Sequence, residues 1–161
     1  MTPVHPDTLA ALTAGIQSEV ASYVFYVEAS KKTETFRIKD ALQKLASEEK
    51  QHFHVLERQY DSLMRSEKWI STADILKQKG LPEIGEEMSA THRALIDEVA
   101  KTDSLADILD IAYRLEVEAR DLFASSAQKA DSPEGKKVFM QLAGFEEGHM
   151  KIISEMKKKY T

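Results

Sequence analysis

Two copies of the motif Glu-x-x-His, 97 residues apart, constrain the fold more than any other feature of the sequence. They occupy residues 49–52 and 146–149. Positions i and i+3 share one helix face, so each copy directs a carboxylate and an imidazole the same way. The same shift of 97 residues places Glu19 on Glu116, a further matched pair of carboxylates. Such a set, drawn from four helices, is typical of a dinuclear metal site in a helix bundle. The candidate metal ligands are Glu19, Glu49, His52, Glu116, Glu146 and His149.

The four candidate Glu residues each lie in a segment with the periodicity of a bundle helix. Apolar residues recur there at alternating spacings of three and four, and each Glu takes a place where an apolar residue is expected. The segments cover about residues 9–30, 38–63, 105–130 and 139–160. We expect them to start at capping signals. The first segment would start at Asp7 or Thr8, and the second after Thr33. The third would start at Thr102 or Asp103, and the fourth at Asp131-Ser132-Pro133.

The spacing of the Glu residues also predicts their depth in the bundle. The midpoint between Glu19 and Glu49 is residue 34, and that between Glu116 and Glu146 is residue 131. Both midpoints fall at expected helix breaks, so antiparallel helices would bring each pair to one level. Residues 67–102 are long enough to travel the length of a ~45 Å helix, and their apolar pattern suggests an extra amphipathic helix. We therefore predict an all-α, ferritin-like four-helix bundle with a long crossover between helices 2 and 3, although a simple up-down-up-down bundle stays open.

The proposed site must overcome the repulsion of four carboxylates that face one core. An isolated buried charge costs several kcal/mol or takes up a proton, whereas two divalent cations would balance four negative charges. Mixed oxygen and nitrogen ligands suit Fe or Mn better than Ca or a closed structural Zn site. The alternative is a metal-free structural bundle whose Glu residues are protonated or paired.

Three residues near the candidate ligands are not expected to bind metal themselves. Tyr26, two turns from Glu19, is a candidate hydrogen-bond partner of a metal ligand, while its counterpart in the repeat, Phe123, has no donor. His54 and Glu48 fall off the apolar seam, so we expect His54 at the surface or in an interface and Glu48 in solvent.

Length and composition narrow the class of protein. With 161 residues we expect a single domain, 1–161, and the net charge of −5 argues against nucleic acid or an anionic membrane as a partner. The chain has no Cys, which excludes disulfides and thiolate-bound metal centres. The first residues lack a basic region followed by an apolar run, so a cytoplasmic protein is expected.

At the six candidate ligands, in their helical order and spacing, the chain resembles the rubrerythrin-like branch of the ferritin-like superfamily. Tyr26, seven residues after Glu19, fits the first-helix pattern of that family. The resemblance implies two iron ions (or Mn, or a mixed pair) that react with hydrogen peroxide or dioxygen, often in a homodimer. The family carries an extra Glu three residues after its third-helix ligand, where this chain has Ala119, and Glu118 lies about 100° away around the helix.

These observations predict a non-haem di-iron oxidoreductase that reduces hydrogen peroxide or dioxygen. Rubredoxin-type iron needs four Cys, which the chain lacks, so the electrons would come from an external donor or from Fe(II) as substrate. One alternative is a ferroxidase or iron-handling protein without peroxidase turnover. The other is the metal-free structural bundle.

Overall fold

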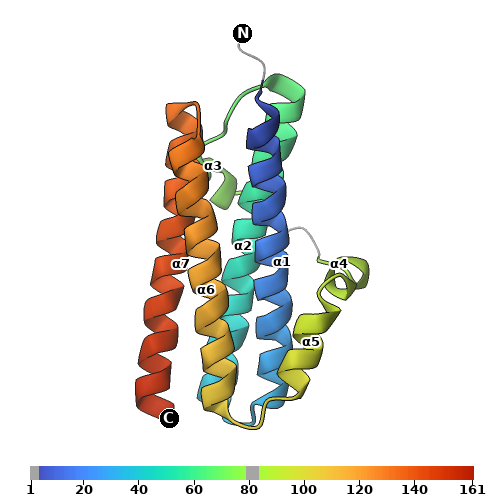
Figure 1. The fold of residues 1–161 in the computed structure, drawn as a ribbon, viewed down its shortest axis with the longest axis vertical. Helices are drawn as coiled ribbons and strands as arrows, with labels where there is room; N and C mark the ends of the chain where they lie inside the picture. Colours follow the sequence, from blue (N-terminus) through green and yellow to red (C-terminus); the bar gives the residue numbers. More distant parts are fainter. Residues whose placement is uncertain (1–3, 79–83) are drawn as a thin grey trace.

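A computed structural model describes residues 4–78 and 84–161 of the chain. These ranges contain seven helices and no strand, which confirms the predicted all-α class. The bundle consists of α1 (Pro6–Lys32), α2 (Phe36–Ser66), α6 (Leu105–Lys129) and α7 (Pro133–Tyr160) (Figure 1). Three short helices lie in the connection between α2 and α6, namely α3 (Thr72–Leu76), α4 (Glu86–Ala90) and α5 (Arg93–Ala100).

The starts of the helices differ by a few residues from those predicted. The Nδ1 atom of His5 accepts a hydrogen bond of 3.1 Å from the backbone N–H of Asp7, so His5 caps α1, and neither Asp7 nor Thr8 does. Ser104, not Thr102 or Asp103, caps α6. The fourth start was predicted correctly, since Ser132 caps α7 and a proline follows it in the first turn.

The order of the helices gives the ferritin-like topology. Helix α1 runs antiparallel to α2, and α6 runs antiparallel to α7, while α2 and α6 run in the same direction (Figure 1). The connection therefore returns along the length of the bundle, where α4 and α5 lie beside α1. The Nζ atom of Lys32 donates to the backbone carbonyls of Val99 (3.1 Å), Ala100 (3.1 Å) and Thr102 (2.7 Å), which fixes the end of this connection. The predicted long crossover is confirmed, with its amphipathic part divided into α4 and α5.

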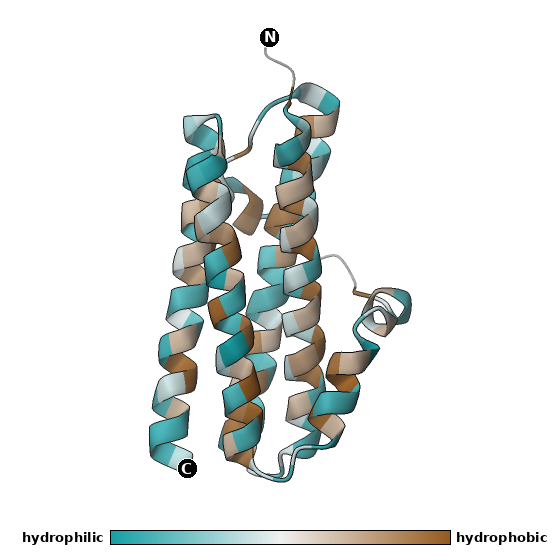
Figure 2. Ribbon diagram, viewed as in Figure 1, coloured by the Kyte–Doolittle hydropathy of each residue, from teal (hydrophilic) through white to brown (hydrophobic). Residues whose placement is uncertain are grey.

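The apolar core consists of two main clusters, one on each side of the candidate ligands. One contains Phe25, Leu42, Leu109 and Ile153, and the other contains Leu12, Leu56, Phe123 and Leu142. Each bundle helix thus passes from one cluster to the other at its candidate Glu. Apolar and hydrophilic residues alternate along the bundle helices in Figure 2, as expected of amphipathic helices. Burial of each large apolar side chain contributes about 1.5–3 kcal/mol to the free energy of folding. This contribution offsets the cost of burying a polar layer between the two clusters.

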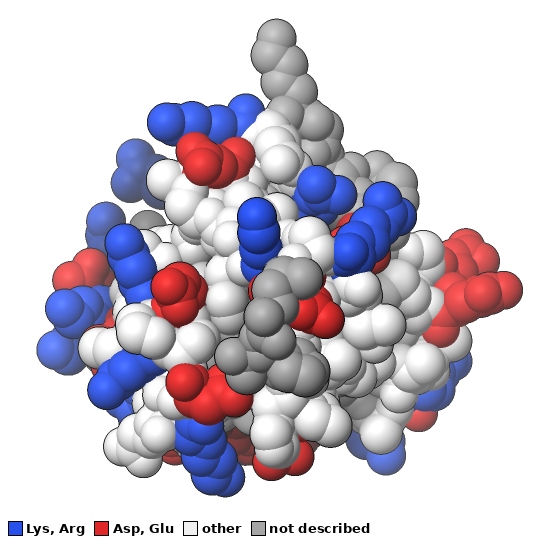
Figure 3. Space-filling view, turned by 90° about the horizontal axis from the view of Figure 1, so that it is seen from above, with Lys and Arg blue, Asp and Glu red and all other residues white. Residues whose placement is uncertain are grey.

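The helices and the charged surface of the described residues bear on contact with a membrane. None of these helices is long and apolar enough to cross a bilayer. At the end of the bundle seen in Figure 3, Lys and Arg side chains are interspersed with Asp and Glu.

Candidate metal centre

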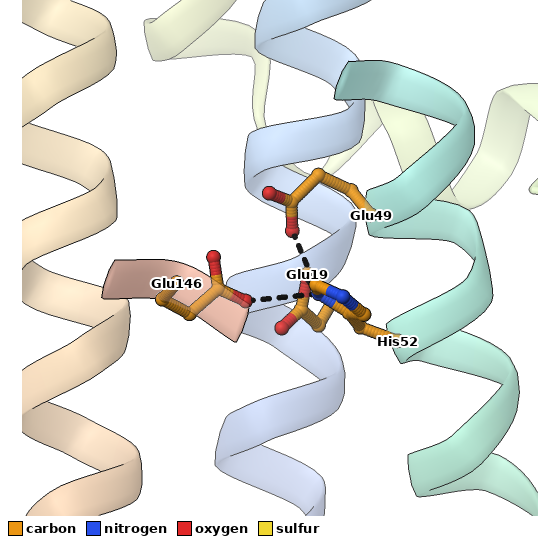
Figure 4. A group of neighbouring side chains, drawn as sticks. All are labelled: Glu19, Glu49, His52 and Glu146. Atoms are coloured by element: carbon orange, nitrogen blue, oxygen red, sulfur yellow. Dashed lines mark hydrogen bonds and ion pairs between the residues drawn. The ribbon is translucent and has the colours of Figure 1, made fainter. Parts of the chain in front are cut away.

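The structure brings all six candidate ligands together in the middle of the bundle. The four Glu side chains are completely buried, and the two His residues are 5% and 4% exposed. Figure 4 shows four of these side chains converging from α1, α2 and α7. The contributors are Glu19 from α1, Glu49 and His52 from α2, Glu116 from α6, and Glu146 and His149 from α7.

The six residues form two overlapping groups, in each of which four ligand atoms lie within 4.8 Å of one another. The first group contains Glu19, Glu49, His52 and Glu146, and the second contains Glu49, Glu116, Glu146 and His149. Glu49 and Glu146 belong to both groups, as bridging carboxylates of a dinuclear site must. Each group adds one imidazole and one carboxylate of its own, so the donor set divides evenly between two metal positions.

Several buried carboxylate oxygens have no hydrogen-bond partner among the described residues. They are both oxygens of Glu19 and one oxygen each of Glu49, Glu116 and Glu146. A buried polar atom without a partner costs about 1–3 kcal/mol, so native proteins rarely keep several in one place. Metal ions would coordinate these oxygens, and two divalent cations would balance the four carboxylates. The residues therefore fit a dinuclear centre, while the number and kind of metal stay predictions.

Two of the four carboxyl groups hold protons in the absence of metal. Burial, reinforced by the carboxylates of Glu146 and Glu49, holds the pKa of Glu19 well above its usual range. Burial and the neighbouring Glu49 carboxylate raise the pKa of Glu116 to about 11. Both groups are therefore neutral carboxylic acids near pH 7.

The two shared carboxylates are ionised, and both imidazoles are protonated. Burial opposes the charge of Glu49, but the protonated Glu19 beside it and both imidazoles lower its pKa to about 2. Burial likewise opposes the charge of Glu146, whose pKa is held well below its usual range by Glu116 and the two imidazoles. Burial disfavours a charged His52 as well, yet hydrogen bonding with the shared carboxylates raises its pKa to about 9, and the pKa of His149 is also raised.

The inner nitrogen of each imidazole faces the carboxylates. The Nδ1 atom of His52 lies 3.0 Å from Oε1 of Glu146, and the Nδ1 atom of His149 lies 2.7 Å from Oε1 of Glu49. The two rings stack with centroids 5.4 Å apart. Nδ1 is therefore the nitrogen that each His would offer to a metal.

Tyr26 is placed as the sequence predicted for a partner of a ligand. Its hydroxyl donates a hydrogen bond of 2.6 Å to Oε1 of Glu116. Burial and the neighbouring carboxylates raise the pKa of Tyr26 well above its usual range, so the hydroxyl keeps its proton and remains a donor.

Two expectations about neighbouring residues were wrong. Glu48 is not fully solvated: its side chain is 35% exposed, and its Oε2 lies 2.8 Å from Nε2 of His149. His54 is not at the surface but 8% exposed, and neither ring nitrogen has a hydrogen-bond partner among the described residues. Helical periodicity places both residues off the core-facing seam, and it carries no information about what another part of the chain brings to that face.

The structure provides no substitute for the extra Glu of the family among the residues around Ala119. Ala119 is buried among apolar side chains, and the side chain of Glu118 is 65% exposed and faces Arg114 at 3.9 Å. Glu118 therefore lies outside the candidate centre, as its angular position predicted.

Comparison with known proteins supports the resemblance. The Rubrerythrin family model matches residues 107–161, which contain α7 and nearly all of α6, and hence three of the six candidate ligands. No curated protein and no solved structure matches the chain. The family match to the last third of the chain, the all-α fold and the paired ligand helices together support a resemblance to rubrerythrin-like proteins.

Proposed function

We propose that the protein is a non-haem di-iron oxidoreductase that reduces hydrogen peroxide. The observation that carries this proposal is the sharing of Glu49 and Glu146 between two complete ligand groups. A centre of this kind holds two metals close enough for one oxidant to span them. The match to the Rubrerythrin family favours iron and peroxide over other metals and substrates.

The burial of the centre favours a small substrate. The carboxylates are fully buried and the imidazoles almost so, which favours a substrate as small as hydrogen peroxide or dioxygen over larger organic molecules. When bound, two ferrous ions would supply the two electrons that, with two protons from solvent, convert one hydrogen peroxide into two waters, and an external donor would restore those electrons. The chain has no Cys and so offers no thiolate ligands for an electron relay of its own.

The protein contributes position and charge to this chemistry. The shared carboxylates are ionised before metal arrives, so a first cation meets two negative oxygens at the centre of the cluster. Tyr26 orients the carboxyl of Glu116 through its hydroxyl proton, which leaves the other oxygen of Glu116 without a protein partner and free to coordinate.

Rapid mixing of the anaerobic Fe(II)-loaded protein with each oxidant tests the proposal. We expect the absorbance of oxidised iron to rise faster with hydrogen peroxide than with an equal concentration of dioxygen. The Glu146→Ala variant is the control, because it removes a shared carboxylate and should abolish the fast phase. Faster oxidation by dioxygen, with accumulation of many more irons than the six ligands can hold, would favour ferroxidase or storage activity over the peroxidase.

Sedimentation of the same samples addresses assembly. We propose a homodimer, because the α3–α5 connection adds bulk along the bundle that a closed storage shell would have to accommodate. A species of two chains is the expected result, and a 24-subunit particle would support iron storage instead.

A further inference from the structure

The two halves of the candidate centre are related by the same shift of 97 residues that relates the motifs. Under this shift Glu19 corresponds to Glu116, and His52 corresponds to His149. The residues that contact these ligands can be compared in the same way. Tyr26 corresponds to Phe123, and Glu48 corresponds to Phe145. In each pair one member is polar and the other is a phenylalanine.

Glu48 anchors the imidazole of His149. The Nδ1 atom of that ring lies 2.7 Å from Glu49 on the inner side, and Nε2 lies 2.8 Å from Oε2 of Glu48 on the outer side. A carboxylate on the outer nitrogen keeps the proton on Nε2, fixes the ring orientation and makes Nδ1 a stronger donor to a metal. Glu48 comes from α2 and His149 from α7, so this contact also joins the two helices across the centre.

Phe145 takes the corresponding place beside His52. Its ring stacks on that imidazole with centroids 5.0 Å apart and an angle of 13° between the planes. A phenyl ring packs against the imidazole but accepts no conventional hydrogen bond from its outer nitrogen. Phe145 therefore covers a face of the His52 ring, and no carboxylate of the described residues lies on the outer nitrogen of His52 as Glu48 does on that of His149.

The carboxylate pair shows the same asymmetry. Glu116 accepts the 2.6 Å hydrogen bond from Tyr26, whereas neither oxygen of Glu19 has a hydrogen-bond partner among the described residues, and its nearest cationic atom is Nδ1 of His52 at 3.6 Å. Phe123, at the position equivalent to Tyr26, has no group to donate. Both polar contacts thus serve the half that contains Glu116 and His149, and the equivalent positions of the other half are occupied by phenylalanines.

We infer that the two metal positions are unequal, that the position at Glu116 and His149 binds metal first and more tightly, and that Glu48 is the positioning residue responsible. This inference rests on the proposed dinuclear centre and adds an order of loading to it. Tyr26 and Glu48 hold the ligands of one position by hydrogen bonds from outside the ligand set, whereas Glu19 and His52 have no such hydrogen bond among the described residues. Loss of such an outer contact typically weakens metal affinity by about 10- to 100-fold.

Anaerobic titration of the whole protein with Fe(II), against a competing chelator, measures the two binding steps. We expect the parent to bind in two separable steps and Glu48→Ala to weaken the tighter step by about 10- to 100-fold, with little change in the weaker one. Glu48→Gln should restore part of the loss, because its amide oxygen still accepts a hydrogen bond without the charge. Glu147→Ala removes an exposed carboxylate next to a ligand and serves as the matched control.

A double substitution provides an independent measurement. Glu48→Phe combined with Phe145→Glu exchanges the two outer neighbours and should make the His52 position the tighter one. Anomalous scattering from crystals loaded with one equivalent of Fe(II) would show iron beside His149 in the parent and beside His52 in the exchanged variant.

The outcomes separate this inference from the proposed function. Two bound metals in the parent, with both steps equal or with both weakened alike by Glu48→Ala, would overturn the inference and leave the centre standing. First occupancy beside His52 in the parent would do the same. A parent that binds no Fe(II) would overturn both. If the exchanged variant fails to fold, the titration of Glu48→Ala still decides the question.

Discussion

Metal loading of this protein should release about four protons near pH 7. The metal-free ligands hold one proton each on Glu19, Glu116, His52 and His149, because each of these groups has a raised pKa. A metal-bound carboxylate or imidazole nitrogen must be free of its proton. The exchange of four protons for two metal ions keeps the net charge of the cluster near zero. Two imidazolium ions balance two carboxylates before loading, and two divalent cations balance four carboxylates after it.

The expected pH dependence is steep. Each displaced proton changes the free energy of loading by about 1.4 kcal/mol per pH unit, so four protons give roughly 5 kcal/mol per unit for the two metals together. The sign follows from the direction of the shifts: as pH falls, protons compete more strongly and binding weakens. The dependence should hold at pH 6–8, which lies below the pKa of His52 at about 9, and should flatten as the pH rises through that value.

Calorimetry in buffers of different ionisation enthalpy measures this release. The slope of the observed enthalpy against buffer enthalpy gives the number of protons, with Fe(II) as the anaerobic probe. A protein that binds two metals and releases one proton or none would refute the assigned protonation states, even though the centre itself would stand.

Four further substitutions, the last two a matched pair of glycines, test single positions. Glu49→Ala should abolish metal binding while the far-ultraviolet circular dichroism stays helical, because it removes a ligand common to both positions. Tyr26→Phe should lower the free energy of unfolding of the metal-free protein, measured by urea denaturation, by about 1–3 kcal/mol, because the buried carboxyl of Glu116 loses its shorter hydrogen bond and keeps the 3.3 Å contact with His149. Gly15→Ala should lower that free energy by about 1–3 kcal/mol, since its Cβ would lie 2.8 Å from a core ring atom. Gly144→Ala, whose Cβ would meet nothing within 4 Å, should instead raise it by about 0.5–1 kcal/mol. Equal effects of the two glycine substitutions would contradict the packing argument.

Periodicity and spacing were sufficient to predict the bundle and the convergence of the six candidate ligands within it. A Glu at a seam position must face the core, and equal distances from a helix break place two such residues at one depth. The length of the connection favoured the crossover but left the topology open, because chain length limits only how far a segment reaches. The choice between Thr102, Asp103 and Ser104 as a cap was missed because all three side chains accept hydrogen bonds from helix N–H groups.

The contacts around the ligands were harder to predict than the ligands themselves. Glu48 meets a histidine that is 101 residues further along the chain, and no local pattern reports which residue a neighbouring helix presents. His54 follows Phe53, which shares an apolar cluster with Ile84 of the connecting segment, so the pattern of α2 alone does not report how much of this part of the helix is buried. The hydrogen bond from Tyr26 to a candidate ligand could be anticipated because Tyr26 lies on the core-facing seam of α1 and carries a donor, although its acceptor, Glu116, lies on α6.

The iron content of the protein after anaerobic loading with Fe(II) tests the central claim most directly. Elemental analysis after removal of loosely bound metal should give about two irons per chain, as four Glu and two His from four helices would bind. A trace of iron in a protein that is fully helical would contradict the assignment of this buried cluster as a metal centre.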